Sequence, residues 1–126
     1  MTEIKFGDIY LAKLVGDGHE QQGVRAVVIA QNDKGNRYAP TVEIIPMSAR
    51  INKARHLPTH VFIKADATNG LRTDSLVLAE QTNTIDKTKL IHRIGSLTYE
   101  ALVAIGVARQ IQSPFPLPGT QAAVTQ

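Results

Sequence analysis

The chain contains no cysteine, no tryptophan and few aromatic residues, and each absence removes a class of function. Without cysteine, disulfides, thiolate nucleophiles and cysteine-ligated zinc sites are excluded. Aromatic residues make up only 5% of the 126 residues, which disfavours binding of single strands by stacking bases along a row of rings. No apolar run approaches the roughly 20 residues of a membrane-spanning helix, and nothing marks a signal peptide. We therefore expect a soluble, cytoplasmic protein.

The composition is otherwise that of one small globular domain. Hydrophobic residues make up 43% of the chain, enough for one core built from Val, Ile, Leu and Ala. The formal charge of +3 and the pI of about 9.4 describe a mildly basic protein. Such an excess is compatible with a polyanionic partner but does not require one.

Short apolar or alternating segments, separated by turn residues, predict a mostly antiparallel β protein. Pro46 is expected to place its strand at an edge or a bulge, and the QNDKGN sequence after the second strand is typical of a turn. The expected strands span residues 8–14, 24–30, 41–49, 60–65 and 75–85.

The C-terminal part of the chain predicts a helix and then a tail. Asp86 is expected to cap a short helical turn, and Thr98 to cap a helix over about 99–112. This helix is apolar nearly all round, so it should be buried on more than one side. The predicted fold is a small antiparallel barrel with a C-terminal helix over 1–112, followed by a disordered tail over 113–126.

A polar cluster between two glycines, in the sequence GHEQQGVR, directly precedes the strand at 24–30. A guanidinium cannot lie unpaired in an apolar core, so Arg25 must have a partner or point to the rim of that core. One interpretation is a purely structural pair between Arg25 and Glu20. The other is an anion-binding Arg25, with His19 and Glu20 beside it to move protons.

The basic segment 50–60 can likewise be a solvated loop or a second basic element. It carries His56 and His60 at the spacing of helical zinc ligands, but Pro58 lies between them and the segment does not read as a helix. We expect neither a metal site nor a cofactor. The chain also has no phosphate-binding glycine loop and no serine-hydrolase motif.

From about Gly7 to Thr98, the sequence resembles the MazF/PemK (Kid) toxins of bacterial type II toxin–antitoxin systems. The resemblance is carried by GDIYLAKL, GHEQQGVRAVVIAQND, PTVEIIPMSARI, LPTHV and DSLVLAEQTNTID, in register. It implies a mainly β fold, an SH3-like barrel with a C-terminal helix, as a homodimer. It also implies metal-independent, sequence-specific cleavage of single-stranded RNA, chiefly mRNA, through a 2′,3′-cyclic phosphate with a free 5′-hydroxyl. A cognate antitoxin would cover the RNA groove with an acidic, mostly disordered segment.

The resemblance also implies roles for individual residues. Arg25 matches the catalytic arginine of the family, and Ser48 stands where relatives place a catalytic threonine. His19 matches a functional histidine of the Kid branch, Glu20 a glutamate of the MazF branch, and Glu80 the acid used as a base by Kid-type members. The expected RNA contacts come from two loops and the AEQTN segment: Gln21, Arg50, Lys53, Arg55, His60, Gln81 and Asn83.

Three positions depart from the family pattern. Leu78 stands where Kid-type members place an arginine that donates a proton, so that role does not transfer. Asn83 replaces an arginine of many relatives, which bears on RNA contacts or sequence preference. Ala26 replaces a proline, which should affect only the geometry of the strand.

Elementary chemistry favours some of these roles over others. The pKa of an arginine exceeds about 12, so Arg25 suits a phosphate clamp and not a general base. A glutamate works as a base near neutral pH if burial raises its pKa, whereas a histidine needs no such tuning. Two alternatives to a ribonuclease remain: a CcdB-like gyrase inhibitor with the same fold, and a barrel that binds RNA or protein without catalysis.

Overall fold

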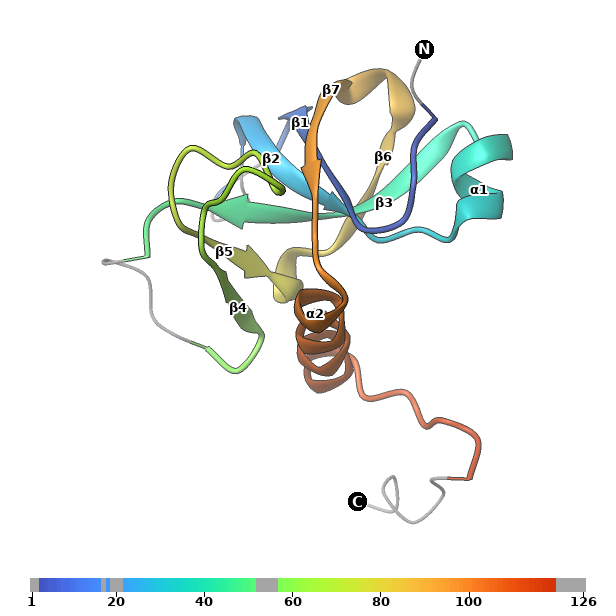
Figure 1. The fold of residues 1–126 in the computed structure, drawn as a ribbon. Coiled ribbons are helices and arrows are strands. Elements are labelled where there is room, and N and C mark those ends of the chain that lie inside the picture. Colours follow the sequence, from blue (N-terminus) through green and yellow to red (C-terminus); the bar gives the residue numbers. More distant parts are fainter. Residues whose placement is uncertain (1–2, 17, 19–21, 52–56, 120–126) are drawn as a thin grey trace.

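The computed structural model describes residues 3–16, 18, 22–51 and 57–119, and Figure 1 shows a twisted sheet with α2 packed below it. Along the chain the elements are β1 (Asp8–Leu14), β2 (Gly23–Ile29), α1 (Asp33–Tyr38), β3 (Thr41–Ser48), β4 (His60–Ile63), β5 (Ser75–Leu78), the 3₁₀ turn η1 (Ala79–Gln81), β6 (Asn83–Asp86), the 3₁₀ turn η2 (Lys87–Lys89), β7 (Leu90–Ser96) and α2 (Tyr99–Gln112).

The strands form one antiparallel sheet in the order β4-β5-β3-β2-β1-β7, and β6 pairs with β3 beside this path. The sheet is open, with β4 and β7 at its ends, so the predicted antiparallel architecture is confirmed but the barrel is not closed. Along one edge β3 changes partner: Thr41–Ile44 pair with β6, whereas Met47 and Ser48 pair with β5.

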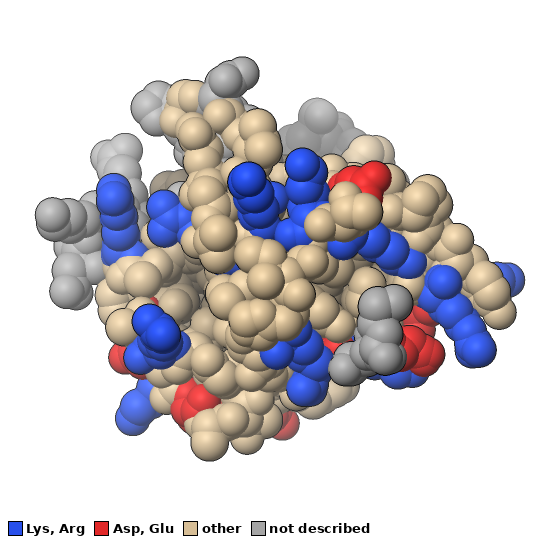
Figure 2. All heavy atoms as spheres, turned by 90° about the horizontal axis from the view of Figure 1, so that it is seen from above, with Lys and Arg blue, Asp and Glu red and all other residues tan. Residues whose placement is uncertain are grey.

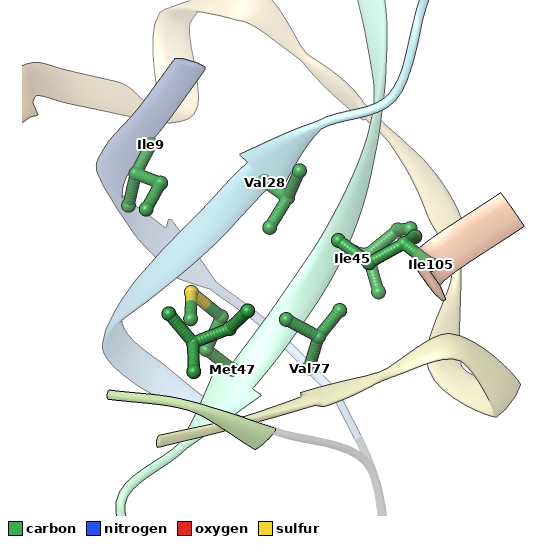
Figure 3. Close-up of a cluster of buried hydrophobic side chains, with 7 residues drawn as sticks. Ile9, Val28, Ile45, Met47, Val77 and Ile105 are labelled. Atoms are coloured by element: carbon green, nitrogen blue, oxygen red, sulfur yellow. The ribbon is translucent and has the colours of Figure 1, made fainter. Parts of the chain in front are cut away.

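Two apolar clusters lie on opposite faces of the central strands, as the alternation of side chains along a strand requires. The first joins β1, β2, β3, β4, β5 and α2; Figure 3 shows Ile45, Val77 and Ile105 meeting within it. The second contains Tyr10, Ala12, Leu14, Val27, Ile29, Val42 and Ile44. The second cluster is the one that supports the candidate site.

Several sequence predictions are confirmed by these elements. The first strand spans 8–14, and the C-terminal helix spans 99–112 with Thr98 as its N-cap. The side chain of Asp86 accepts a hydrogen bond from the N–H of Thr88 and so caps η2.

Three predictions about local structure are wrong. The expected strand at 75–85 is broken by η1, because β5 and β6 pair with different parts of β3. The QNDKGN segment contains the start of α1, capped by Asn32. Pro46 lies in an inner strand opposite Val27. A proline is tolerated there because it falls in the gap between the β6 and β5 pairings, where no ladder bond is needed on that side.

Helix α2 is buried on one side only, contrary to the sequence prediction. Ile105 and Ala108 face the sheet and are buried. Four residues spaced four apart form an exposed row, which we call the α2 apolar row: Tyr99, Val103, Val107 and Ile111, with exposed fractions between 49% and 76%. No helix within the described residues is long and apolar enough to cross a membrane.

Candidate functional site

Arg25 and Ser48 lie at the same end of the same face of the sheet. Val27 and Pro46 form the last pair of the β2–β3 ladder, and Arg25 and Ser48 each stand two residues beyond it, at the same end of the two strands. Both side chains share the face of the second apolar cluster, at its rim. Opposite Arg25 on β1 stands Ala12, whose small side chain leaves room for the guanidinium stem. The strands thus hold a cation and a hydroxyl on one rigid surface.

Each of these two side chains has a backbone partner. The half-buried Arg25 donates from Nε to the carbonyl oxygen of Gln22 at 2.9 Å, which fixes the direction of its guanidinium. Ser48 is 8% exposed, and its oxygen accepts from the N–H of Arg50 at 3.2 Å. That bond does not use the hydroxyl hydrogen, so Ser48 retains a donor for a ligand.

A hollow of about 390 Å³ is lined on one side by Leu14 and Pro46. Leu14 stands two residues from Ala12 on β1, and Pro46 two residues from Ser48 on β3. The opposite wall comes from η1 and β6 and includes Glu80, Gln81 and Asn83, whereas Arg25 and Ser48 are not among the lining residues. Asn83 is exposed and donates from Nδ2 to the carbonyl oxygen of Gln81 at 3.3 Å. The structure therefore brings these two predicted RNA contacts to the same hollow.

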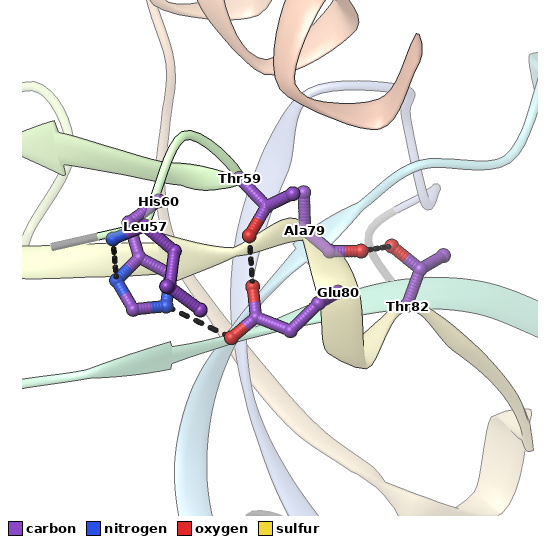
Figure 4. A network of polar contacts seen from close by, with 6 residues as sticks. All are labelled: Leu57, Thr59, His60, Ala79, Glu80 and Thr82. Carbon is purple, nitrogen blue, oxygen red and sulfur yellow. Dashed lines mark hydrogen bonds and ion pairs between the residues drawn. The ribbon is translucent and has the colours of Figure 1, made fainter. Parts of the chain in front are cut away.

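Glu80 and His60, assigned separately from the sequence, contact one another (Figure 4). His60 Nε2 lies 2.8 Å from Glu80 Oε2, and the hydroxyl of Thr59 donates to Glu80 Oε1 at 2.8 Å. The side chains of His60 and Glu80 are 7% and 23% exposed. Thr59 was not predicted, and no local sequence signal marks it, because its partner is 21 residues away.

Part of the predicted site lies outside the described residues. This applies to His19, Glu20 and Gln21 in the first loop and to Lys53, Arg55 and His56 in the second. The alternative pairing of Arg25 with Glu20 falls there too. Arg50, at the start of the second loop, is exposed. Within the described part of the chain, no group of three or more His, Asp or Glu side chains could hold a metal ion.

The surface charge matches a polyanionic ligand in sign. Figure 2 shows the face that is uppermost in Figure 1, where basic side chains are spread widely and acidic ones are fewer. The exposed Lys13 and Arg93 lie on β1 and β7. Arg93 is partly neutralised, since its Nε lies 3.2 Å from the carboxylate of Asp8.

Comparisons with known proteins agree with this fold. The chain is 45% identical over 109 residues to the endoribonuclease EndoA of Bacillus subtilis, covering 86% of this chain and 92% of the relative. Among solved structures, MazF from Deinococcus radiodurans matches with a TM-score of 0.78 at 16% identity, covering 91% of this chain and all of that one. An endoribonuclease in complex with its cognate antitoxin from a Mycobacterial species matches with a TM-score of 0.69 at 22% identity, over 94% and 100% of the chains.

The family model for PemK-like, MazF-like toxins of type II toxin–antitoxin systems matches residues 5–112. That span includes every strand described above and ends with α2. This chain belongs to the PemK/MazF family of type II toxins.

Proposed function

We propose that this toxin is a metal-independent endoribonuclease that cleaves single-stranded mRNA at a short sequence and so arrests translation. The observation that carries the proposal is that Arg25 and Ser48 stand at the same end of one face of the sheet. The name of the B. subtilis relative supports the reaction class. We assign the activity to residues 1–112, take 113–126 as a tail, and expect the protein to act in the cytoplasm, where mRNA is translated.

In the proposed reaction, the 2′-oxygen of the RNA attacks the adjacent phosphorus and the bond from phosphorus to the 5′-oxygen breaks. A base removes the proton of the 2′-hydroxyl, and an acid gives a proton to the leaving 5′-oxygen. The products are a 2′,3′-cyclic phosphate and a 5′-hydroxyl. Negative charge builds up on the non-bridging oxygens, and stabilising it is the step for which the described residues are suited.

Arg25 is the clamp for that charge. Its guanidinium is always protonated and can give two parallel N–H bonds to a phosphate. The bond from its Nε to Gln22 leaves the terminal nitrogens for the ligand. Ser48 adds one hydroxyl donor. For the two proton transfers we propose His19 and Glu20, whose side chains titrate in the required range or can be tuned to it.

The expected partners follow from the same surfaces. The α2 apolar row is exposed in the single chain, and a second copy of the chain would bury it, as in the proposed homodimer. The acidic segment of a cognate antitoxin would compete with RNA for the basic face. The Mycobacterial endoribonuclease, solved in complex with its cognate antitoxin, supports an antitoxin as a partner.

The proposal is tested by replacing Arg25 by Ala and by Lys. Arg25→Ala is expected to lower kcat by about 10²–10³-fold, the usual cost of removing an electrostatic stabiliser. Arg25→Lys keeps the positive charge but loses the planar guanidinium that gives two parallel hydrogen bonds. Its kcat should therefore lie between those of wild type and Arg25→Ala. Near-normal cleavage by folded Arg25→Ala would overturn the assignment. A pH–rate profile that is flat between about pH 5 and 8 and unchanged by His19→Ala would overturn the proton-transfer roles.

A further inference from the structure

The carboxylate of Glu80 is held on both oxygens by two neighbours in sequence. Oε1 accepts from the hydroxyl of Thr59 at 2.8 Å, and Oε2 lies 2.8 Å from Nε2 of His60. Thr59 is 6% exposed and the His60 side chain 7% exposed, so both donors are largely shielded from water. Figure 4 shows the carboxylate directed toward this pair.

The bonds of His60 fix which of its ring nitrogens carries hydrogen. Nδ1 accepts from the backbone N–H of Leu57 at 3.4 Å, so the hydrogen of the neutral ring lies on Nε2. Nε2–H then donates to Glu80 Oε2, while Thr59 donates to Oε1. With a donor on each oxygen, the carboxylate is held in one orientation.

The same three residues join two segments of the chain. Ala79 N–H donates to the carbonyl oxygen of Thr59 at 3.0 Å, and His60 pairs with Leu78 across β4 and β5. The segment at 57–60 is therefore fastened to η1 through both backbone and side chains. It ends the basic loop that starts at Arg50, and η1 leads directly to Asn83.

We propose that Thr59, His60 and Glu80 form a clamp that fixes the η1–β6 segment, with Gln81 and Asn83, to the chain at 57–60. Glu80 is then a positioning residue and not the general base of the reaction, and His60 orients Glu80 and does not contact RNA. The inference rests on the proposed ribonuclease function. The clamp anchors the RNA contacts of Gln81 and Asn83, so loosening it disturbs substrate binding more than the chemical step.

The decisive variants are Glu80→Gln and Glu80→Ala. In Glu80→Gln, Oε1 can accept from His60 and the amide nitrogen can donate to the oxygen of Thr59, so the clamp re-forms with weaker, neutral bonds. We expect its kcat/KM to fall by about fivefold at most. Glu80→Ala leaves two shielded donors unpaired and should lower kcat/KM by about 10–100-fold, mainly through KM. The acidic limb of the pH–rate profile should be the same in wild type and Glu80→Gln.

Glu43→Gln is the matched control. Glu43 lines the same hollow of about 550 Å³ beside α2 as Glu80, and its carboxylate lies 3.2 Å from Arg109 on that helix. Its kinetics should match wild type. A base at Glu80 would give the opposite pattern: both Glu80 variants would lose about 10²–10⁴-fold in kcat, and the acidic limb would disappear.

Limited proteolysis supplies a readout that does not depend on activity. Trypsin should cut Glu80→Ala after the exposed Arg50 faster than it cuts wild type or Glu43→Gln. Wild-type protein that cleaves no RNA, with this proteolysis pattern intact, would overturn the proposed function and leave the clamp standing. A different outcome would overturn the clamp alone. In that outcome wild type cleaves RNA, Glu80→Ala is cut by trypsin no faster than wild type, and Glu80→Gln loses its kcat.

Discussion

Gly95 is a position at which the fold leaves no room for a side chain, and Gly95→Ala tests that packing directly. A Cβ there would lie 2.3 Å from the carbonyl carbon and oxygen of Asn69 and 2.5 Å from the carbonyl oxygen of Thr68. These are backbone atoms, so no side-chain rotation can relieve the overlap. The turn they belong to must move away from β7.

That movement would strain a turn built on the buried side chain of Asn69. Its Oδ1 accepts from the N–H groups of Asp66 at 3.1 Å and Leu71 at 3.0 Å, and its Nδ2 donates to the carbonyl oxygen of Lys64 at 2.9 Å. Overpacking alone costs about 1–3 kcal/mol, and each weakened hydrogen bond adds about 1 kcal/mol. With two bonds weakened, Gly95→Ala should lower the free energy of unfolding by about 3–5 kcal/mol.

Gly106→Ala is the matched control, because nothing lies within 4 Å of a Cβ at this exposed position of α2. Alanine is the better helix former, so this variant should be more stable by up to about 1 kcal/mol. Both are measured by urea unfolding, followed by circular dichroism at one protein concentration, since dimerisation would add to stability. A change of less than about 0.5 kcal/mol in Gly95→Ala would show that the turn at Thr68 and Asn69 accommodates the added methyl group.

Three further predictions concern charge, assembly and capping. The pKa of Asp33 is lowered, first by the bond from the N–H of Phe6 and then by that from Asn36. Its stabilising effect is therefore present above the unfolded-state pKa near 4 and lost as the pH falls below it. The urea midpoint of Asp33→Asn should fall less than that of wild type between pH 5 and pH 2; parallel curves would contradict this. Val107→Lys in the α2 apolar row should weaken self-association in sedimentation velocity, and an unchanged dissociation constant would exclude that face. Thr98→Ala removes the oxygen that accepts from the N–H of Ala101 at 3.2 Å and should cost about 1 kcal/mol in urea unfolding, whereas no loss would show the cap to be dispensable.

Elements with strong local signals could be predicted from the sequence. The alternation in 8–14 and the capping residue before 99–112 depend on neighbours along the chain, and both elements have the predicted bounds. By contrast, the sequence predicts one strand over 75–85. Its interruption by η1 coincides with the change of partner along β3, which is a tertiary effect.

The burial of α2 shows a different limit. The apolar composition of the helix predicts burial on several sides, yet Val103 and Val107 are exposed in the single chain. A hydrophobic pattern predicts that a helix face is buried. It does not predict whether the sheet of the same chain or another molecule covers that face.

The sequence predicts which residues belong to the candidate site, but not which of them contact one another. Arg25 stands out because a guanidinium cannot lie unpaired in an apolar strand, and Ser48 is identified through the family resemblance. The register then places both at one end of one face. The contacts of Glu80 with Thr59 and His60 join residues about 20 positions apart, and only folding brings them together.

The ends of the RNA products test the proposed ribonuclease activity. Purified wild-type protein, free of antitoxin, is incubated with a mixed-sequence RNA in excess EDTA, and the fragment ends are identified. We predict cleavage at one short motif, with 2′,3′-cyclic phosphate and 5′-hydroxyl ends, lost in Arg25→Ala. Intact RNA across many sequences, with folded protein, would contradict it and favour a gyrase inhibitor or a non-catalytic binding protein.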